Sequence, residues 1–226
     1  MEDNSVWIAL PDGHLQIETR GLLGKAGLHF YRGRRNGSSP FRVKVIRPQD
    51  MPLQIACGNF DLAVTGKDWV LDQLYRFPSS PIQELLDLGL GMVRVVAVVV
   101  QEVPADNIEE FRLLVAQGRF PRVRVASEYV NIADRYASDH HLAGYRVIPT
   151  WGATEAFLPE DADLLIENTQ TGATLARNKL KIIDTLFTST ARLIANRGTL
   201  ADSQKRETIE SVVYALRRAL EAGSSP

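Results

Sequence analysis

The chain has 226 residues, of which 45% are hydrophobic and 23% are charged, and its formal net charge at pH 7 is −1. This length suffices for one large or two small globular domains, and the balanced charge argues against a protein that holds nucleic acid or an acidic membrane through a global positive field. The single cysteine, Cys57, excludes an intrachain disulfide and is expected to be a buried thiol in a reducing compartment.

The longest apolar run, Met92–Val100, is interrupted by Arg94 and is too short to cross a membrane. Its many valines predict a buried strand instead. The chain begins Met-Glu-Asp-Asn, which is the opposite of the cationic start of a signal peptide. We therefore expect a cytoplasmic protein with no membrane association.

In the first half of the chain, short apolar runs alternate with segments of helical periodicity, and Gly, Pro, Asn or Asp separate them. A basic segment rich in Gly and Ser, residues 32–40, predicts a mobile loop. The predicted elements are a strand over 6–10, a helix stopped by Gly27, a strand over 41–46, a helix that Asp50 caps and that runs through Cys57, a strand over 61–65, a helix from Gly66, and strands over 85–88 and 92–100.

The second half continues this alternation and ends in an amphipathic helix. Its elements are a helix over 107–116, a strand over 122–126, a helix over 129–139, a strand over 145–149, a short helix after Gly152, a strand over 164–166 followed by a turn and a helical pattern, strands over 182–187 and 191–195, and a closing helix with Ile209, Val212, Val213, Leu216 and Leu220 on its core face.

Together these elements predict an α/β protein with mostly parallel sheets and two lobes. The strand over 92–100 is expected to cross between the lobes, and the late strands are expected to return to the first lobe. Lobe I then comprises residues 1–97 and 181–226, and lobe II comprises residues 98–180.

Glycine and polar residues gather where five predicted strands end, which is where open α/β sheets bind ligands. The sequence therefore predicts one composite site in the cleft between the lobes. The five segments are residues 11–14, 65–68, 126–128, 151–155 and 171–174.

The segment Asp163–Leu180 is the most informative of these. An apolar strand leads to Thr171-Gly172-Ala173-Thr174 and then to a helical pattern. Backbone amides at a helix start bind anions, glycine allows close approach, and two threonine hydroxyls add donors, so this turn predicts a phosphate site. The alternative is an ordinary helix N-cap, where Thr and Gly are also common.

Other chemistries lack their motifs. Gly66-Lys67 has no upstream glycine of a P-loop, and Arg94 stands where a dinucleotide fingerprint needs its third glycine. No serine lies in a G-x-S-x-G turn, and the four histidines have no metal-ligand spacing. We therefore expect neither a covalent nucleophile nor structural zinc.

Eight short motifs occur in order between Val6 and Asn196. They are A-L-P-D-G-H-L over 9–15, R-P-Q-D-M-P over 47–52, D-L-A-V-T-G-K-D over 61–68, L-G-L-G with Arg94, R-V-A-S-E-Y over 124–129, G-A-T-E over 152–155, Q-T-G-A-T-L over 170–175, and S-T-A-R-L with Asn196. Each is weak alone, but together they resemble the catalytic subunit of ATP phosphoribosyltransferase, which performs the first step of histidine biosynthesis.

This resemblance implies a two-lobed fold like that of a type II periplasmic binding protein. It also implies transfer of phosphoribosyl from phosphoribosyl pyrophosphate (PRPP) to ATP, giving phosphoribosyl-ATP and pyrophosphate, with Mg²⁺ as cofactor. The length fits the short form of the family. That form implies a homo-oligomer with a regulatory subunit resembling histidyl-tRNA synthetase.

The resemblance also implies two groups of site residues in the cleft. Because the reaction depends on alignment and charge stabilisation, none is a covalent nucleophile. Asp163 and Glu167 are further expected to hold ribose hydroxyls or Mg²⁺. The PRPP group is Asp163, Glu167, Gln170, Thr171, Gly172, Ala173 and Thr174. The ATP and cleft group is Asp12, Gly13, His14, Thr65, Gly66, Lys67, Asp68, Arg94, Glu128 and Glu155.

Asp12, His14 and Glu128 stand at positions that are basic in the family pattern, although two anionic substrates favour cations. One hypothesis is drift within the family, with cations supplied elsewhere. The other is a divergent paralog that phosphoribosylates another acceptor, or a non-catalytic regulatory protein that binds PRPP or a nucleotide. The candidate replacement cations are Lys67, Arg94, Arg32, Arg34 and Arg35.

Overall fold

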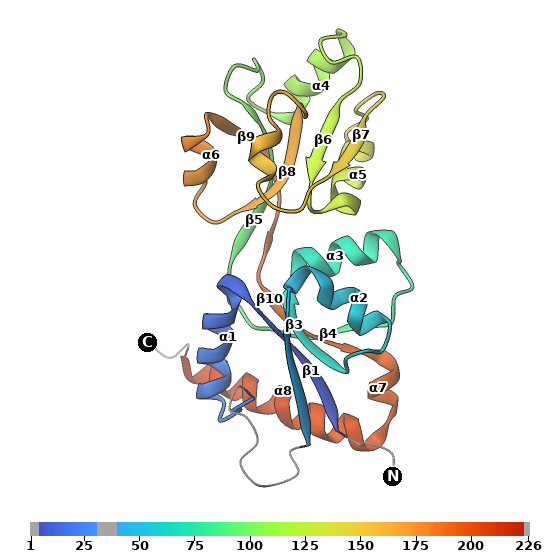
Figure 1. Cartoon of the computed structure of the whole chain (residues 1–226), viewed down its shortest axis with the longest axis vertical. Coiled ribbons are helices and arrows are strands. Elements are labelled where there is room, and N and C mark those ends of the chain that lie inside the picture. The colour runs from blue at the N-terminus through green and yellow to red at the C-terminus, as the bar shows by residue number, and fades with distance from the viewer. Residues whose placement is uncertain (1–4, 31–39, 224–226) are drawn as a thin grey trace. The chain divides into compact units, whose positions relative to one another are not determined.

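The computed structural model describes residues 5–30 and 40–223, which fold into two compact units, each built on a five-stranded sheet (Figure 1). The first unit comprises residues 1–73, 77–91 and 190–226, and the second comprises 74–76 and 92–189. The predicted boundaries after residues 97 and 180 therefore differ from those of the structure. The predicted loop over 32–40 lies, except for Pro40, outside the described residues.

The first unit has the strand order β2-β1-β3-β10-β4. Strand β1 runs parallel to β2 and β3, whereas β10 runs antiparallel to β3 and β4. The strands are β1 (Val6–Pro11), β2 (Phe41–Ile46), β3 (Leu62–Gly66), β4 (Ile82–Asp87) and β10 (Ala191–Asn196). The helices are α1 (Gly13–Lys25), the 3-10 turn η1 (Pro48–Asp50), α2 (Met51–Ala56), α3 (Lys67–Arg76), α7 (Arg197–Ala201) and α8 (Ser203–Gly223).

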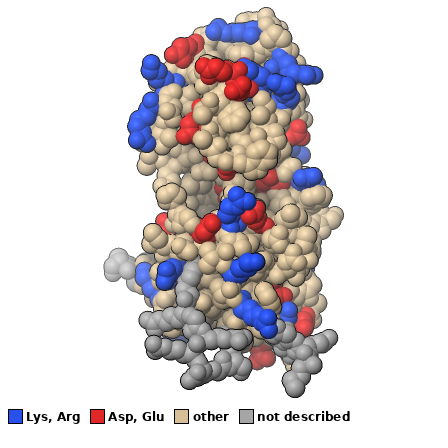
Figure 2. Space-filling model, viewed as in Figure 1, with Lys and Arg blue, Asp and Glu red and all other residues tan. Residues whose placement is uncertain are grey.

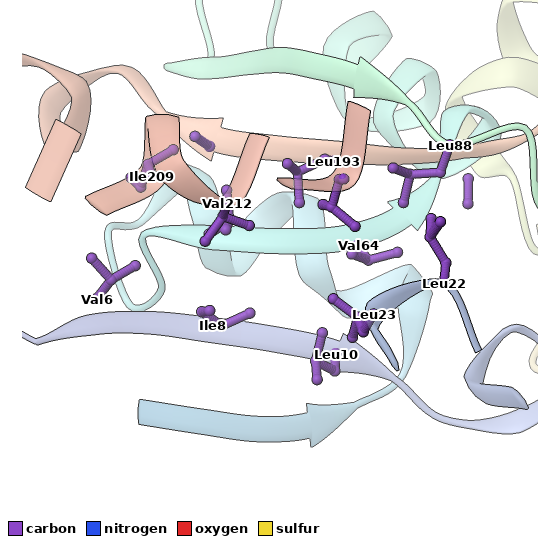
Figure 3. Packing of buried hydrophobic residues seen from close by; sticks show 14 residues of the cluster. Val6, Ile8, Leu10, Leu22, Leu23, Val64, Leu88, Leu193, Ile209 and Val212 are labelled. Atoms are coloured by element: carbon purple, nitrogen blue, oxygen red, sulfur yellow. The ribbon is translucent and has the colours of Figure 1, made fainter. Parts of the chain in front are cut away.

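Alternate side chains of the first sheet face a core that α1 and α8 cover (Figure 3). Strand β1 contributes Val6, Ile8 and Leu10, and α8 contributes Ile209 and Val212 at helical spacing. The predicted core face of the closing helix is confirmed in this way. The intervening residues of the central strands, such as Ala9, Ala63 and Ile194, are also buried, and α2 packs against β3 and β10, whereas Trp7 of β1 is 38% exposed.

The second unit has the strand order β7-β6-β8-β5-β9. Strand β6 runs parallel to β7 and β8, and β5 runs antiparallel to β8 and β9. The strands are β5 (Val93–Val100), β6 (Arg124–Ser127), β7 (Arg146–Pro149), β8 (Leu164–Thr169) and β9 (Leu180–Ser189). The helices are α4 (Ile108–Ala116), α5 (Val130–Asp139), the 3-10 turn η2 (Thr154–Phe157) and α6 (Ala173–Arg177).

The α/β class and the order of elements are confirmed, but the sheets are mixed rather than mostly parallel, because β5 and β10 each run antiparallel to both neighbours. Only β10 returns to the first sheet. Strand β9 stays in the second unit, where it pairs along its whole length with β5. The prediction that both late strands return to lobe I is therefore wrong for β9.

Two local expectations in the first unit are also wrong. Cys57 is exposed, not buried, because it follows the last residue of α2, where the chain turns away through Gly58 at φ +73°. Asp50 precedes α2 but makes no side-chain cap; its carboxylate instead accepts a hydrogen bond from Arg47 Nε at 3.2 Å. Asp50 therefore stands at the N-cap position of α2, but its carboxylate bonds to Arg47 and not to the first backbone amides of the helix.

Within the described ranges, no helix is both long enough and apolar enough to span a membrane. On the face drawn in Figure 2, acidic and basic side chains are interspersed rather than gathered into one broad patch of a single sign.

Candidate functional site

The carboxyl ends of β6, β7 and β8 lie at one edge of the second sheet, because these three strands are parallel. The antiparallel strand β5 begins at the same edge, with Arg94 opposite Thr169 of β8. We call this the second-unit edge. Of the predicted site residues, it brings together Glu128 after β6, Glu155 after β7, Arg94, and the residues from Glu167 to Thr174.

The loop Gln170–Thr174 leaves β8 at this edge and enters α6. Gly172 of this loop has φ +76°, a backbone conformation that residues other than glycine rarely adopt. The Gly172 amide donates to Thr169 Oγ1 at 2.9 Å. Thr171, Ala173 and Thr174 are exposed. Because α6 has only five residues, its dipole is small, and the loop's own amides and hydroxyls are the groups suited to an anion.

Arg177 stands one helical turn beyond this loop and was missed as a site residue. Its guanidinium donates to Thr174 Oγ1 at 3.3 Å, so a cation lies against the exposed hydroxyl. The signal in the sequence was the spacing Thr174-x-x-Arg177, which puts both side chains on one face of a helix. Arg94 of β5 lies opposite Thr169 at the end of β8, so Arg94 and Arg177 both supply positive charge near the loop.

Glu167 is a partly buried carboxylate on β8. Burial raises its pKa to about 7, and the negative charges of Glu128 and Glu155 act in the same direction. Hydrogen bonds from the Asn168 amide and the Thr154 hydroxyl act in the opposite direction and stabilise the charged form. The sequence predicted a carboxylate here, but its raised pKa follows first from its burial and then from Glu128 and Glu155, which only the fold brings near it.

Glu167→Gln is expected to stabilise the protein at pH 8 by about 2–3 kcal/mol, and at pH 5 by less than about 1 kcal/mol. A carboxyl whose pKa is raised from 4.5 to about 7 on folding contributes stability below its unfolded pKa and loses it as pH rises through 7. Urea denaturation of both proteins at the two pH values measures this difference. A difference that is the same at pH 5 and pH 8 would contradict the raised pKa.

Asp163 does not belong to this edge. It precedes β8, at the end of the strand opposite to the loop, and forms an ion pair with Arg124 at 2.8 Å. It also accepts a hydrogen bond from the Arg124 amide at 2.8 Å, so its role is to join β8 to β6. The expectation that Asp163 stands before the loop as a ligand for ribose or Mg²⁺ is corrected accordingly.

The pair Asp163 and Glu167 does not fit a shared Mg²⁺ ion, because four residues of extended chain, roughly 13 Å, separate them. Among residues 5–30 and 40–223, no group of three or more His, Cys, Asp or Glu side chains is arranged to hold a metal.

The remaining predicted residues lie in the first unit, where the parallel strands β1 and β3 end at one edge. Asp12, Gly13 and His14 follow β1, and His14 is exposed. Thr65, the last residue but one of β3, is fully buried, and its hydroxyl donates to the Pro48 carbonyl at 2.7 Å, so its side chain holds η1 in place.

Gly66, Lys67 and Asp68 form the start of α3. A Cβ atom on Gly66 would lie 2.0 Å from the Asp68 carboxylate, so only glycine allows Asp68 to remain folded back and buried. Lys67 is partly exposed, and its amide donates to the Thr190 carbonyl at 3.0 Å. At this turn the Lys67 side chain is therefore partly open to solvent, whereas the Asp68 side chain is buried.

A cluster of one arginine and two carboxylates lies at the same edge and was not predicted as part of the site. Arg192 of β10 lies opposite Thr65 and forms ion pairs with Glu84 and Asp87. Burial opposes ionisation of Asp87, but hydrogen bonds from Gly89, Thr190 and Arg192 lower its pKa below the ordinary value. The motif S-T-A-R-L carried this signal, and the structure shows that its arginine anchors the turn after β4.

The predicted site residues thus form two groups, one in each compact unit. Both groups lie at carboxyl ends of parallel strands, as the pattern of strand ends predicts. That they share one cleft stays a prediction.

Solved structures with the same fold include enzymes and binding proteins. A chain of the ATP phosphoribosyl transferase (HisG:HisZ) complex from Thermotoga maritima matches with a TM-score of 0.77 at 22% identity, covering 96% of this chain and 99% of that one. The alkanesulfonate-binding protein SsuA from Xanthomonas axonopodis pv. citri matches with a TM-score of 0.59 at 10% identity, covering 96% and 73%. The fold is therefore the two-lobed fold of type II periplasmic binding proteins.

Sequence relatives decide the family. The family model HisG, ATP phosphoribosyltransferase, matches residues 47–218. An ATP phosphoribosyltransferase of Prosthecochloris aestuarii is 34% identical over 222 residues, covering 95% of this chain and 71% of that protein. The chain belongs to the ATP phosphoribosyltransferase family.

Proposed function

We propose that this protein transfers the phosphoribosyl group of PRPP to ATP, giving phosphoribosyl-ATP and pyrophosphate, as the first step of histidine biosynthesis. Family membership supports the reaction, and the loop Gln170–Thr174 carries the proposal structurally. This loop places two exposed threonine hydroxyls at the carboxyl end of a strand, with Arg177 beside them, and the amides of Gly172 and Ala173 donate to Thr169 Oγ1 and Thr171 Oγ1. These groups suit the 5′-phosphate of PRPP.

Catalysis by these residues consists of binding and orientation. A ring nitrogen of the adenine attacks the anomeric carbon of PRPP as the bond to pyrophosphate breaks, so no group on the protein has to form a covalent bond. The loop holds one end of the ribose, which fixes the direction of its anomeric carbon. Cationic side chains such as Arg94 and Lys67 are suited to offset the negative charge of the two substrates.

We propose that Mg²⁺ reaches the protein bound to the pyrophosphate of PRPP. Mg²⁺ commonly binds through substrate phosphates and one or two carboxylates rather than through a cage made of protein side chains. This agrees with the lack of a three-ligand cluster in the described parts of the chain.

We further propose a cytoplasmic homo-oligomer that assembles with a regulatory subunit. The match to a chain of a HisG:HisZ complex supports this partner, since the two chains share their fold over nearly their whole length. Size-exclusion chromatography of the chain with and without a HisZ-type protein tests it. Two separate peaks at micromolar concentration would contradict the proposal.

The experiment that tests the proposed reaction is a mass-spectrometric product assay with PRPP, Mg²⁺ and a pool of acceptors that includes ATP. We expect phosphoribosyl-ATP and pyrophosphate. That result would mean that Asp12, His14 and Glu128 are compatible with the family reaction. Another phosphoribosylated product would identify a divergent paralog, and PRPP binding without any product would identify a regulatory protein.

A further inference from the structure

A tryptophan stands exposed at the second-unit edge. Trp151 follows β7 and exposes 85% of its surface, whereas Trp7 exposes 38% and packs beside Phe60 and Arg42. Single exposed apolar residues are common on protein surfaces, so this exposure decides nothing alone. The support and the neighbours of Trp151 are what distinguish it.

Two buried threonines hold the turn that carries Trp151. Thr150 and Thr154, on either side of it, are 4% and 1% exposed, and their hydroxyl oxygens lie 2.9 Å apart. Between them, Gly152 has φ +95° and Ala153 has φ +49°, and this left-handed region is unfavourable for a residue that has a side chain. Such conformations are enriched at ligand sites, where the surrounding structure maintains them.

This turn is also connected to the strand that leads into the phosphate loop. The Thr150 amide donates to the Ser127 carbonyl of β6 at 3.1 Å, and the Thr154 hydroxyl hydrogen-bonds to Glu167 of β8. The indole is therefore displayed on a rigid part of the same sheet edge. A tryptophan side chain has only two rotatable bonds, so it loses little conformational entropy when a ligand covers it.

The charges around Trp151 differ from those around the loop. A Glu128 carboxylate oxygen lies 3.9 Å from where a Cβ on Gly152 would stand, and Glu155 follows in the same turn. Carboxylates accept hydrogen bonds from N–H groups and repel phosphate. This end of the edge therefore suits a planar ring that carries N–H donors, whereas the end with Arg94 and Arg177 suits phosphate.

The distance between Trp151 and the loop Gln170–Thr174 fits a ligand whose ring lies at one and whose phosphate lies at the other. Strand β6 separates β7 from β8, so Trp151 and the loop after β8 leave the sheet two strand spacings apart, about 10 Å. A ribose held by its 5′-phosphate at the loop can thus present its anomeric carbon toward a ring that lies against the indole.

We propose that Trp151 stacks on the purine ring of the acceptor nucleotide and that Glu128 accepts a hydrogen bond from the exocyclic amine of that ring. The identity of the acceptor as ATP rests on the proposed function. The stacking surface rests on the exposure, support and surroundings of Trp151. Glu128 then has a role at a position that is basic in the family pattern, because it faces the base and not a phosphate.

The test is isothermal titration calorimetry of Trp151→Ala, Trp151→Leu and Trp151→Phe with ATP and, separately, with PRPP and Mg²⁺. We expect Trp151→Ala and Trp151→Leu to raise the Kd for ATP about 10-fold, since loss of base stacking on an aromatic side chain has effects of that order. Trp151→Phe should stay within about threefold of the wild type because it keeps an aromatic face. The Kd for PRPP should not change. Leu113→Ala is the control, since Leu113 is 53% exposed on α4 of the same unit.

An unchanged Kd for ATP in Trp151→Ala would overturn the proposal. An equal loss of PRPP affinity would also overturn it, because Trp151 would then only support the loop. The proposal would also be overturned if Trp151→Ala changed the oligomeric state and left the Kd for ATP unchanged, because the indole would then belong to a contact between protein chains. Wild-type product formation is measured in parallel: tight ATP binding through Trp151 without product would retain the stacking and reject the proposed reaction.

Discussion

Replacing Thr171 and Thr174 together with alanine is expected to raise the Kd for PRPP about 100-fold. Each hydroxyl is exposed in the loop after β8, and a hydrogen bond to a charged phosphate oxygen contributes roughly 1.5–3 kcal/mol. At the lower figure the two bonds together contribute about 3 kcal/mol, which corresponds to a loss of about 100-fold while the backbone amides remain. Calorimetric titration with PRPP and Mg²⁺ measures the change, and phosphoribosyl-ATP formation should fall in parallel.

The matched control for this double variant is Thr185→Ala, an exposed threonine on β9 of the same unit. It should bind PRPP like the wild type. Arg177→Ala should give a smaller loss, about 10-fold, because it removes one cation and leaves the loop intact. If the double variant keeps wild-type affinity, the loop does not bind the phosphate.

Asp61→Ala is expected to lower the free energy of unfolding by about 3 kcal/mol. Asp61 is 6% exposed, and its carboxylate accepts hydrogen bonds from the Trp7 amide and the Thr199 hydroxyl, both at 2.8 Å, and from Lys205 at 3.1 Å. These bonds tie the start of α8 and the short helix before it to β1. Alanine leaves three donors without their acceptor, and unpaired buried groups are strongly destabilising.

Urea denaturation at pH 7 measures this loss, with two comparison variants. Asp61→Asn keeps acceptor capacity for part of the network and should cost less. Lys205→Met should cost about 1 kcal/mol or less, because the lysine is partly exposed and a methionine keeps much of its packing. A loss below about 1 kcal/mol in Asp61→Ala would show that solvent replaces the missing carboxylate.

Local patterns predicted the elements of this fold well because they depend on neighbours in the chain. The apolar run of β1 and the helical spacing of Ile209 and Val212 each predict buried side chains, and Val6, Ile8, Leu10, Ile209 and Val212 are buried in the structure. Strand partners are not local. The segments of β9 and β10 both predict strands, but nothing in the sequence of β9 says that it pairs with β5.

The site shows the same division between local and non-local information. The loop Gln170–Thr174 is continuous in sequence, so its residues could be named from one motif. Asp163 is only four residues from Glu167, but a strand carries these two side chains to different ends of a sheet, and Arg124 pairs with Asp163 there. Arg192 and its acidic partners come from β10 and β4, which are distant in sequence.

The position of β10 has a consequence for how the chain folds during synthesis. Strand β10 lies between β3 and β4 in the first sheet, yet it is made only after residues 92–189 of the second unit. Until it emerges from the ribosome, β3 has an unpaired edge, β4 has no partner in the sheet, and the first sheet lacks one of its inner strands. The second unit, apart from residues 74–76, is one continuous stretch. We therefore expect it to be the first to complete its core, while the segment made earliest waits for the strand that closes its sheet.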